Sequence, residues 1–134
     1  MRRSILILFF ISFILGVKAQ DTGLATYYGR KFNNKKTASG EIYRKDSLVC
    51  AHRTYPFGTL LKVKSLKNDK EVIVRVIDRG PRARKRIIDL SYAAAKELNM
   101  ENHGVVPVEV SIFTDPLNIV NQIDTLPKAF SPAF

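Results

Sequence analysis

Short runs in which apolar and polar residues alternate extend over most of the chain, and turn-forming residues separate them. Alternation with a period of two, in runs rich in Val, Ile and Tyr, predicts β-strands. We expect about six short strands, at residues 24–28, 48–51, 59–66, 71–77, 87–90 and 105–113. The run EVIVRVI at 71–77 has apolar residues on both faces, which indicates a strand buried inside a closed sheet.

One helix is predicted, at residues 92–99, where three alanines favour helix and permit close packing. Asp89 and Ser91 precede it, and either side chain can cap its first turn. Amphipathic helices that could cover an open sheet do not occur between the predicted strands. We therefore expect a mainly β fold, a small closed barrel with one short α-helix.

Residues 1–19 have the pattern of a secretory signal peptide. Arg2 and Arg3 precede an apolar stretch at 5–15, and small residues ending at Ala19 form a cleavage site. A transmembrane anchor is the alternative, but a span needs roughly 20 apolar residues. We therefore expect secretion across the inner membrane of a bacterium, to the periplasm or the outside, with no stable membrane anchor after cleavage.

The remaining chain divides into two parts. Residues 20–113 suit one barrel domain with one modest core. Residues 114–134 contain Pro116, Pro127 and Pro132, which interrupt any regular element and predict an irregular C-terminal tail.

The chain is strongly basic, with a formal net charge of +10. Loss of Arg2, Arg3 and Lys18 with the signal segment lowers this charge to +7. A secreted cationic protein is attracted to polyanions, which outside the inner membrane include wall polymers and lipid head groups. Nucleic acid fits the charge but not the compartment, so we expect no nucleic-acid partner.

Cysteine and metal-binding patterns are sparse. Cys50 is the single cysteine, so an intrachain disulfide is excluded, and its apolar neighbours indicate a small buried side chain. The spacing of Cys, His and carboxylates does not resemble a zinc site. We expect neither a metal nor a cofactor.

Four motifs together carry a resemblance to a known family. They are "GLATYYGRKFNNKKTASGEIY", "AHRTYPFGTLLKVKSL", "VRVIDRGP" and "RIIDLSYAAAKELNM", in this order over residues 23–113. They resemble the RlpA-like double-psi β-barrel family, the septal-ring lytic transglycosylases of bacterial cell walls. The resemblance implies a six-stranded double-psi β-barrel. Expansins and a family of cellulases have similar barrels, so the fold alone leaves the function open.

The resemblance implies cleavage of peptidoglycan glycan strands between N-acetylmuramic acid and N-acetylglucosamine, leaving 1,6-anhydromuramic ends. Such an enzyme would act in cell-wall remodelling or daughter-cell separation. The Asp of the Asp-Arg-Gly-Pro motif, Asp78, is expected to be the catalytic acid/base. Glu41 is expected beside it as proton donor, or as a like charge that raises the pKa of Asp78. His52 is expected to orient a carboxylate or a sugar hydroxyl.

Five further residues are expected to bind substrate: Tyr28, Ser39, Arg53, Arg79 and Asp89. The guanidinium of Arg79 should point away from Asp78, because a direct ion pair would lower the pKa of that acid. Asp89 corresponds to a functional acid of the expansin and cellulase barrels, although capping of the following helix is its alternative role.

Aromatic and basic side chains extend this expected binding surface. Tyr27, Tyr28 and Tyr43 could stack on sugar rings or fill the core, and alternation along a strand turns one of Tyr27 and Tyr28 inward. Arg53 and the cluster at 82–86 could bind anionic groups of the wall, or form a plain solvated face.

Other functions fit parts of the pattern. A non-catalytic, expansin-like module that binds or loosens the wall would keep the groove and the cations. A general polyanion binder would need only the charge, and a hydrolase would need a second carboxylate that activates water. The leading hypothesis is a monomeric lytic transglycosylase whose partner is peptidoglycan.

Overall fold

The computed structural model describes residues 20–118, so the predicted signal segment 1–19 and most of the predicted tail lie outside the described residues. Each of the six expected strands is present, with ends that differ from the predictions by at most three residues. The strands are β1 (Asp21–Tyr27), β2 (Val49–His52), β3 (Leu60–Ser65), β4 (Glu71–Asp78), β5 (Arg86–Leu90) and β6 (Val106–Ile112). The predicted helix is α1 (Tyr92–Glu97), and a short 3-10 helix, η1 (Arg30–Phe32), was not predicted.

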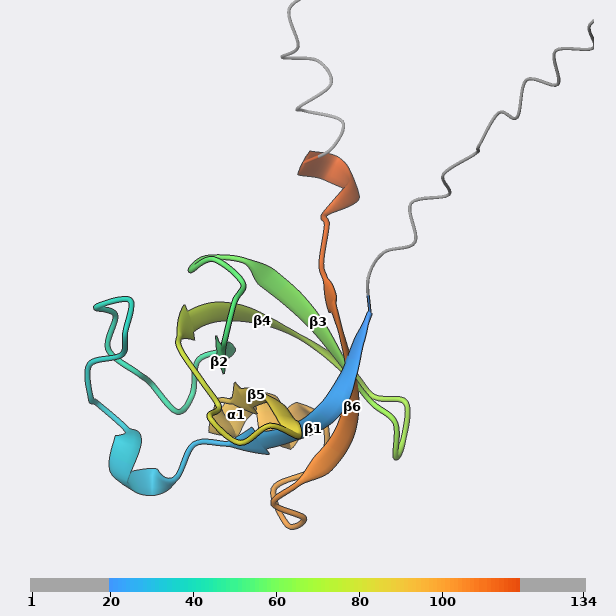
Figure 1. The fold of residues 1–134 in the computed structure, drawn as a ribbon, viewed down its shortest axis with the longest axis horizontal. Helices are drawn as coiled ribbons and strands as arrows, with labels where there is room; N and C mark the ends of the chain where they lie inside the picture. Colours follow the sequence, from blue (N-terminus) through green and yellow to red (C-terminus); the bar gives the residue numbers. More distant parts are fainter. Residues whose placement is uncertain (1–19, 119–134) are drawn as a thin grey trace, which may run out of the picture.

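The six strands form one closed barrel in the order β1-β5-β2-β4-β3-β6, and β6 pairs again with β1. The pairs β1·β5 and β2·β4 are parallel, whereas the other four pairs are antiparallel. Figure 1 shows the strands curving around a common interior. Closure pairs the backbone N–H and C=O groups that an open sheet would leave unpaired at its edges. The closed barrel confirms the predicted mainly β fold.

The barrel interior is filled by the inward members of each alternating strand. Most of these residues are β-branched or Leu, and they are fully buried, as Val63, Val74, Ile88 and Val108 illustrate. Cys50 lies among them with 0% exposure, as its apolar neighbours indicated. Burial raises the pKa of its thiol to about 12. Cys50 is therefore an inert part of the core.

Helix α1 covers part of this core with alanines. Ala94 and Ala95 are fully buried, and the helix contacts β4 and β1. Ser91 caps the helix, because its hydroxyl accepts a hydrogen bond of 3.2 Å from the amide of Ala94. Asp89 instead lies within β5, so the capping role considered for it is wrong.

The segment 29–48 covers the outer face of the barrel beside β2 and β4. It contains η1 and encloses a second small core made by Tyr43, Val49 and Ile77. Tyr28 packs against this second core from the end of β1. Tyr27 packs against the main core, so the two neighbouring tyrosines face opposite sides, as alternation predicted.

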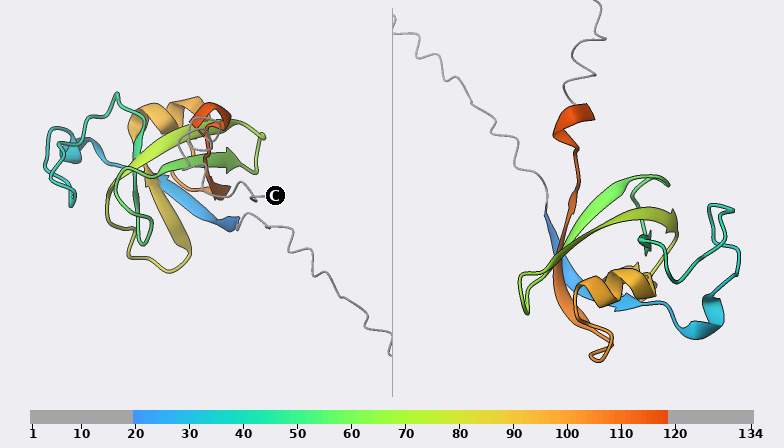
Figure 2. Two further views of the ribbon diagram at one scale, coloured as in Figure 1. Left: turned by 90° about the horizontal axis from the view of Figure 1, so that it is seen from above. Right: turned by 180° about the vertical axis from the view of Figure 1, so that it is seen from behind.

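Different elements lie at the two ends of the barrel. The hairpin that joins β3 to β4 lies at one end, where Asp69 takes a positive φ of 61°. The first residues of β1 and the last of β6 are paired neighbours, with Asp21 opposite Val110 (Figures 1 and 2). Among the described residues, no helix is long and apolar enough to cross a membrane.

Candidate active site

Four residues on neighbouring strands form a row across the barrel wall, which we call the acid row: Thr26, Asp89, Ala51 and Asp78. Thr26 of β1 is opposite Asp89 of β5, Asp89 is opposite Ala51 of β2, and Ala51 is opposite Asp78 of β4. Strands lie about 4.8 Å apart, so the two aspartate backbones are about 10 Å apart. Residues opposite one another share a face of the sheet, and Ala51 is the small residue between the two acids.

The carboxylate of Asp78 is fixed by three hydrogen bonds. The hydroxyl of Tyr28 donates to Oδ2 at 2.6 Å, and the amides of Ala38 and Arg79 donate to Oδ1 at 2.9 Å. The side chain is half-buried. An irregularity between Cys50 and Ala51 in the β2·β4 pairing shifts the register and places Asp78 beside Ala51. Asp78 is therefore held in one orientation at the end of a buried strand.

Tyr28 connects the carboxylate of Asp78 to the second core. Its ring stacks on Tyr43 with centroids 4.4 Å apart and meets the edge of Phe32 at 5.8 Å. Burial, and then the hydrogen bond to Asp78, raise the pKa of Tyr28 far above its ordinary value. The hydroxyl therefore stays protonated and remains a donor to Asp78. Tyr43, by contrast, is 2% exposed and fills the core instead of presenting its ring to a ligand.

Asp89 lies in a less polar setting. The Thr26 hydroxyl donates to its Oδ1. Burial raises the pKa of Asp89, and the charge of Asp78 adds to this, whereas the bond from Thr26 and the charges of Arg86 and Arg53 oppose it. This carboxyl group therefore holds a proton at a higher pH than an exposed aspartate does.

Gly80 leaves the space beside Asp89 open. Its φ of 129° lies in the region that favours glycine, and a Cβ atom built there would be 3.8 Å from Oδ2 of Asp89. A larger side chain would thus be strained and would cover the acid. The Asp-Arg-Gly-Pro turn therefore serves both acids, one at its first residue and one beside its glycine.

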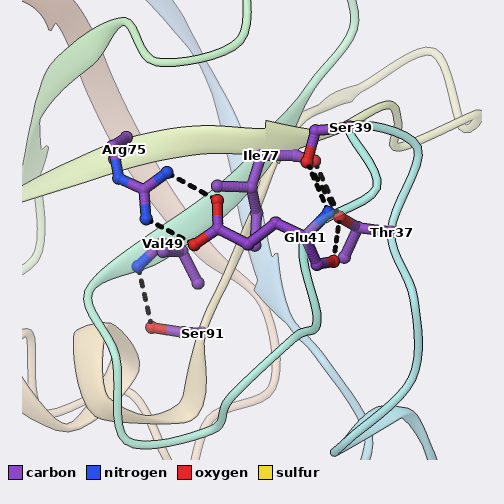
Figure 3. Close-up of polar contacts among 7 residues, drawn as sticks. All are labelled: Thr37, Ser39, Glu41, Val49, Arg75, Ile77 and Ser91. Atoms are coloured by element: carbon purple, nitrogen blue, oxygen red, sulfur yellow. Dashed lines mark hydrogen bonds and ion pairs between the residues drawn. The ribbon is translucent and has the colours of Figure 1, made fainter.

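Glu41 has a setting that differs from the one a proton donor requires. It is an exposed residue whose two carboxylate oxygens each accept a hydrogen bond of 2.7 Å from the guanidinium of Arg75 (Figure 3). Hydrogen bonding to Arg75 lowers the pKa of Glu41. The side chain is thus ionised and engaged on the outer face of β4, and it makes no recorded hydrogen bond with Asp78.

The loop that carries Glu41 is attached to the end of β4. The hydroxyl of Thr37 lies 2.9 Å from the carbonyl of Ile77, and the amide of Ser39 donates to the same carbonyl at 3.2 Å (Figure 3). Ala38 lies between these two residues and donates its amide to Asp78. Ser39 itself is exposed, and its hydroxyl lies 3.1 Å from that of Thr37 and accepts from the amide of Glu41 at 3.3 Å. The loop therefore positions a donor to Asp78.

His52 lies on the other face of β2. It is opposite Ile88, a core residue, whereas the preceding Ala51 is opposite Asp89, and successive side chains of a strand point to opposite faces. Its Nδ1 accepts from the amides of Thr54 and Tyr55, both at 3.2 Å. Burial lowers the pKa of His52, so the imidazole is neutral near neutral pH. The structure does not bring His52 to the acid row.

Two arginines expected to bind substrate hold the backbone around the Asp-Arg-Gly-Pro turn. Arg53 donates from Nε to the carbonyl of Pro81 at 2.6 Å. Arg79 donates from Nη1 to the carbonyl of Tyr55 at 2.8 Å, and its guanidinium lies 3.9 Å from the ring centroid of Phe57. The guanidinium of Arg79 therefore points away from Asp78, which is the orientation that an acid at position 78 requires.

Clefts flank Tyr28 on two sides. One, of about 590 Å³, is lined by Tyr28, Tyr92, Arg30 and Lys45 among others. A second, of about 400 Å³, contains Thr26, Tyr28 and Asp89. Tyr27, Tyr28 and Gly29 line both, so a polymer could pass from one to the other beside Asp89. Within residues 20–118, no group of three His, Cys, Asp or Glu side chains is placed to hold a metal ion.

Three contributors to this site were not foreseen: the hydroxyl of Thr26, the amide of Ala38 and the guanidinium of Arg75. The sequence signal for Thr26 is its place two residues before Tyr28 in the same strand pattern. A backbone donor such as Ala38 has no residue-type signature. Nothing in the sequence around Arg75 indicates which carboxylate it pairs with. Only the folded chain shows that this partner is Glu41.

The closed six-stranded barrel of interleaved parallel and antiparallel pairs is that of a double-psi β-barrel protein. Residues 20–110 match the family model described as lytic transglycolase, and the chain belongs to this family.

Relatives and solved structures agree with this assignment. The chain is 54% identical over 90 residues to a probable endolytic peptidoglycan transglycosylase RlpA of Aquifex aeolicus, covering 67% of this chain and 40% of that protein. It is 43% identical over 99 residues to the endolytic peptidoglycan transglycosylase RlpA of Campylobacter jejuni, covering 74% and 36%. The chain thus spans less than half the length of these two relatives.

Two solved structures share the barrel. The Streptomyces papain inhibitor superimposes with a TM-score of 0.58 at 26% identity, over 72% of this chain and 96% of the inhibitor. An expansin of Clavibacter michiganensis gives a TM-score of 0.57 at 25% identity, over 73% of this chain and 52% of the expansin. The same barrel therefore occurs in proteins with different names and roles.

Proposed function

We propose that the chain is a lytic transglycosylase that cleaves peptidoglycan glycan strands between N-acetylmuramic acid and N-acetylglucosamine. Family membership and the names of the relatives support this proposal. The observation that carries it is the acid row, which sets a half-buried carboxyl group with a raised pKa level with a second carboxylate held by three donors. The two acids therefore lie in different environments, as acid/base pairs in active sites do.

The reaction consumes no water. A carboxylic acid protonates the glycosidic oxygen as the bond from C1 of the muramic residue to that oxygen breaks. The C6 hydroxyl of the same residue attacks C1, and its proton passes to a carboxylate. One bond forms and one breaks, and the products are a 1,6-anhydromuramic end and a free 4-hydroxyl on the neighbouring sugar.

In this proposal, the acid and base duties expected of Asp78, with Glu41 as the other candidate proton donor, are divided between Asp78 and Asp89. Asp89 is the proposed proton donor, because burial raises the pKa of its carboxyl group above that of an exposed aspartate. Asp78 accepts the proton of the C6 hydroxyl, since Tyr28 and two amides fix its oxygens. Glu41 positions the loop that supplies one of those amides, and His52 holds the 52–55 turn.

The cellular setting follows from the substrate. We propose that the protein acts outside the inner membrane, in the periplasm or the extracellular space, after removal of the signal segment 1–19. Its proposed task is cell-wall remodelling or daughter-cell separation. We expect it to work as a monomer, with peptidoglycan as its partner and no nucleic acid.

The test is digestion of purified sacculi, followed by mass spectrometry of the released fragments. Wild type should release anhydro-muropeptides, and Asp89→Asn and Asp78→Asn should each release at least a hundredfold less while remaining folded. Reducing ends without anhydro ends would indicate a hydrolase and would contradict the proposal.

A second candidate is a non-catalytic module that binds and loosens the wall, and the structural similarity to an expansin favours it. Such a module would sediment with sacculi and release no product. In that case Asp89→Asn would leave every measured property except stability unchanged.

A further inference from the structure

A cluster of six exposed cations borders the acid row, and we call it the cationic rim. Its members are Arg53, Arg79, Arg82, Arg84, Lys85 and Arg86. Within residues 20–118 the recorded ion pairs are Lys64–Asp69 and Arg75–Glu41, so none of the six cations is in an ion pair with a described residue. The rim therefore carries a concentrated positive charge that the described part of the protein does not neutralise by direct contact.

Two members of the rim are held in place by backbone carbonyls. Arg53 donates to Pro81 at 2.6 Å from Nε, and from Nη2 to the carbonyls of Ala83 and Arg86. Arg79 uses Nη1 for carbonyl groups and stacks on Phe57. Because these two side chains are already fixed, they lose little conformational entropy when a ligand binds.

Donors remain available on both fixed guanidinium groups. Nη1 of Arg53, and Nε and Nη2 of Arg79, have no recorded partner among the described residues. Both arginines are exposed residues. Planar guanidinium donors match the geometry of a carboxylate.

The two arginines that carry these donors line a hollow beside Asp89. Arg53, Arg79, Gly80, Pro81 and Arg82 line an open cleft of about 400 Å³. The open space at Gly80 also lies against Oδ2 of Asp89. A strand positioned for cleavage at the acid row would therefore extend a neighbouring substituent into the cleft.

We infer that this cleft binds a carboxylate carried by the glycan strand that is being cut. The inference rests on the proposed function, and it adds a determinant of substrate choice. Two parts of peptidoglycan supply such a group: the lactyl carboxylate of muramic acid, free once the stem peptide is removed, and the carboxylates of the stem peptide. The shared chemistry is a carboxylate near the scissile sugar.

The experiment combines a substrate change with a charge change. Full-length mature protein is sedimented with peptide-bearing sacculi and with amidase-stripped glycan. Each polymer is used as such and after its carboxyl groups have been converted to neutral amides with carbodiimide. Arg82→Gln is compared with Lys67→Gln, which removes the same charge from an exposed residue of the hairpin at the other end of β4. Neither side chain has a recorded contact that would affect folding.

We expect Arg82→Gln to weaken binding at least threefold on a carboxylate-bearing polymer and to match wild type on its amidated form. Lys67→Gln should stay within about twofold of wild type on every polymer, as a distant surface charge does. A loss confined to stripped glycan assigns the cleft to the lactyl group, and a loss confined to sacculi assigns it to the peptide. Equal losses for the two variants, or a loss that persists after amidation, would overturn the inference.

Product release separates this inference from the proposed function. Anhydro ends released by wild type, with unchanged binding by Arg82→Gln, would overturn the carboxylate site and leave the transglycosylase intact. Carboxylate-dependent binding by Arg82 without any anhydro ends would support the site and contradict the enzyme.

Discussion

Removal of the Tyr28 hydroxyl tests the central geometry of the acid row. Tyr28→Phe deletes the donor that lies 2.6 Å from Oδ2 of Asp78 and keeps the ring that stacks on Tyr43. The two amide donors to Oδ1 remain, so Asp78 keeps its backbone contacts but can turn about them. The change thus affects the orientation of one oxygen with little effect on packing.

The expected magnitude follows from the type of bond. A hydrogen bond to a charged group contributes about 1.5–3 kcal/mol. If the transition state loses this stabilisation, kcat/KM falls by about ten- to 150-fold, since 1.36 kcal/mol corresponds to a factor of ten. The free energy of unfolding should change by less than about 1 kcal/mol, because water can reach the half-buried Oδ2 and replace the hydroxyl.

The assay is the initial rate of release of anhydro ends from sacculi, with thermal unfolding as a check on folding. Tyr27→Phe is the matched control, because the Tyr27 hydroxyl donates to the carbonyl of Glu101 and Tyr27 packs against the other core. It should lose far less activity than Tyr28→Phe, because its hydroxyl donates to Glu101 and not to Asp78. A Tyr28→Phe enzyme as active as wild type, or an equal loss in both variants, would refute the reasoning that Tyr28 orients Asp78.

Three further predictions concern other groups. Glu41→Gln and Arg75→Gln should lower activity by similar factors, because each removes the ion pair that anchors the loop whose amide donates to Asp78. If, in the same assay, Glu41→Gln alone abolished activity, Glu41 would be the proton donor. Burial raises the pKa of Asp89, so the folded state binds its proton more tightly than the unfolded chain, and the resulting stability is present in acid and lost as the pH rises through the raised pKa. Asp89→Asn should therefore unfold at a higher temperature than wild type at neutral pH, with a gain that shrinks in acid; a gain independent of pH would contradict this. Cys50 should resist alkylation by iodoacetamide in the native protein and react after unfolding, since its pKa is about 12 and it is fully buried; rapid native labelling, measured by mass spectrometry, would show that the core is open.

The strands could be predicted because each buries one face, so a period of two is present in the sequence itself. Strand order could not be predicted from that period. The neighbours of β2 are β5 and β4, which lie far along the chain, and only the closed barrel selects them. The family motifs supplied the barrel type, and the structure then supplied the register that places Asp78 and Asp89 in one row.

Site residues were harder to predict than strands, and the reason differs for each. The predicted strand ended at Ala51, whereas β2 continues through His52, and alternation then turns the imidazole to the core face. The partner of Glu41 is 34 residues away on another element, so its ionic setting has no local sequence signal. The sequence allowed Asp89 to be either a site residue or the cap of the helix. In the structure Ser91 caps the helix, since its hydroxyl accepts from the amide of Ala94.

The pairing of β1 with β6 has a consequence for assembly. Asp21 and Val110 are opposite each other, so segments joined before β1 and after β6 would emerge from one side of the molecule. Thr26 lies five residues further along β1, about 17 Å away at 3.3 Å per residue. Tethers or fused domains at either terminus could hold such a barrel against a surface while the acid row stays unobstructed.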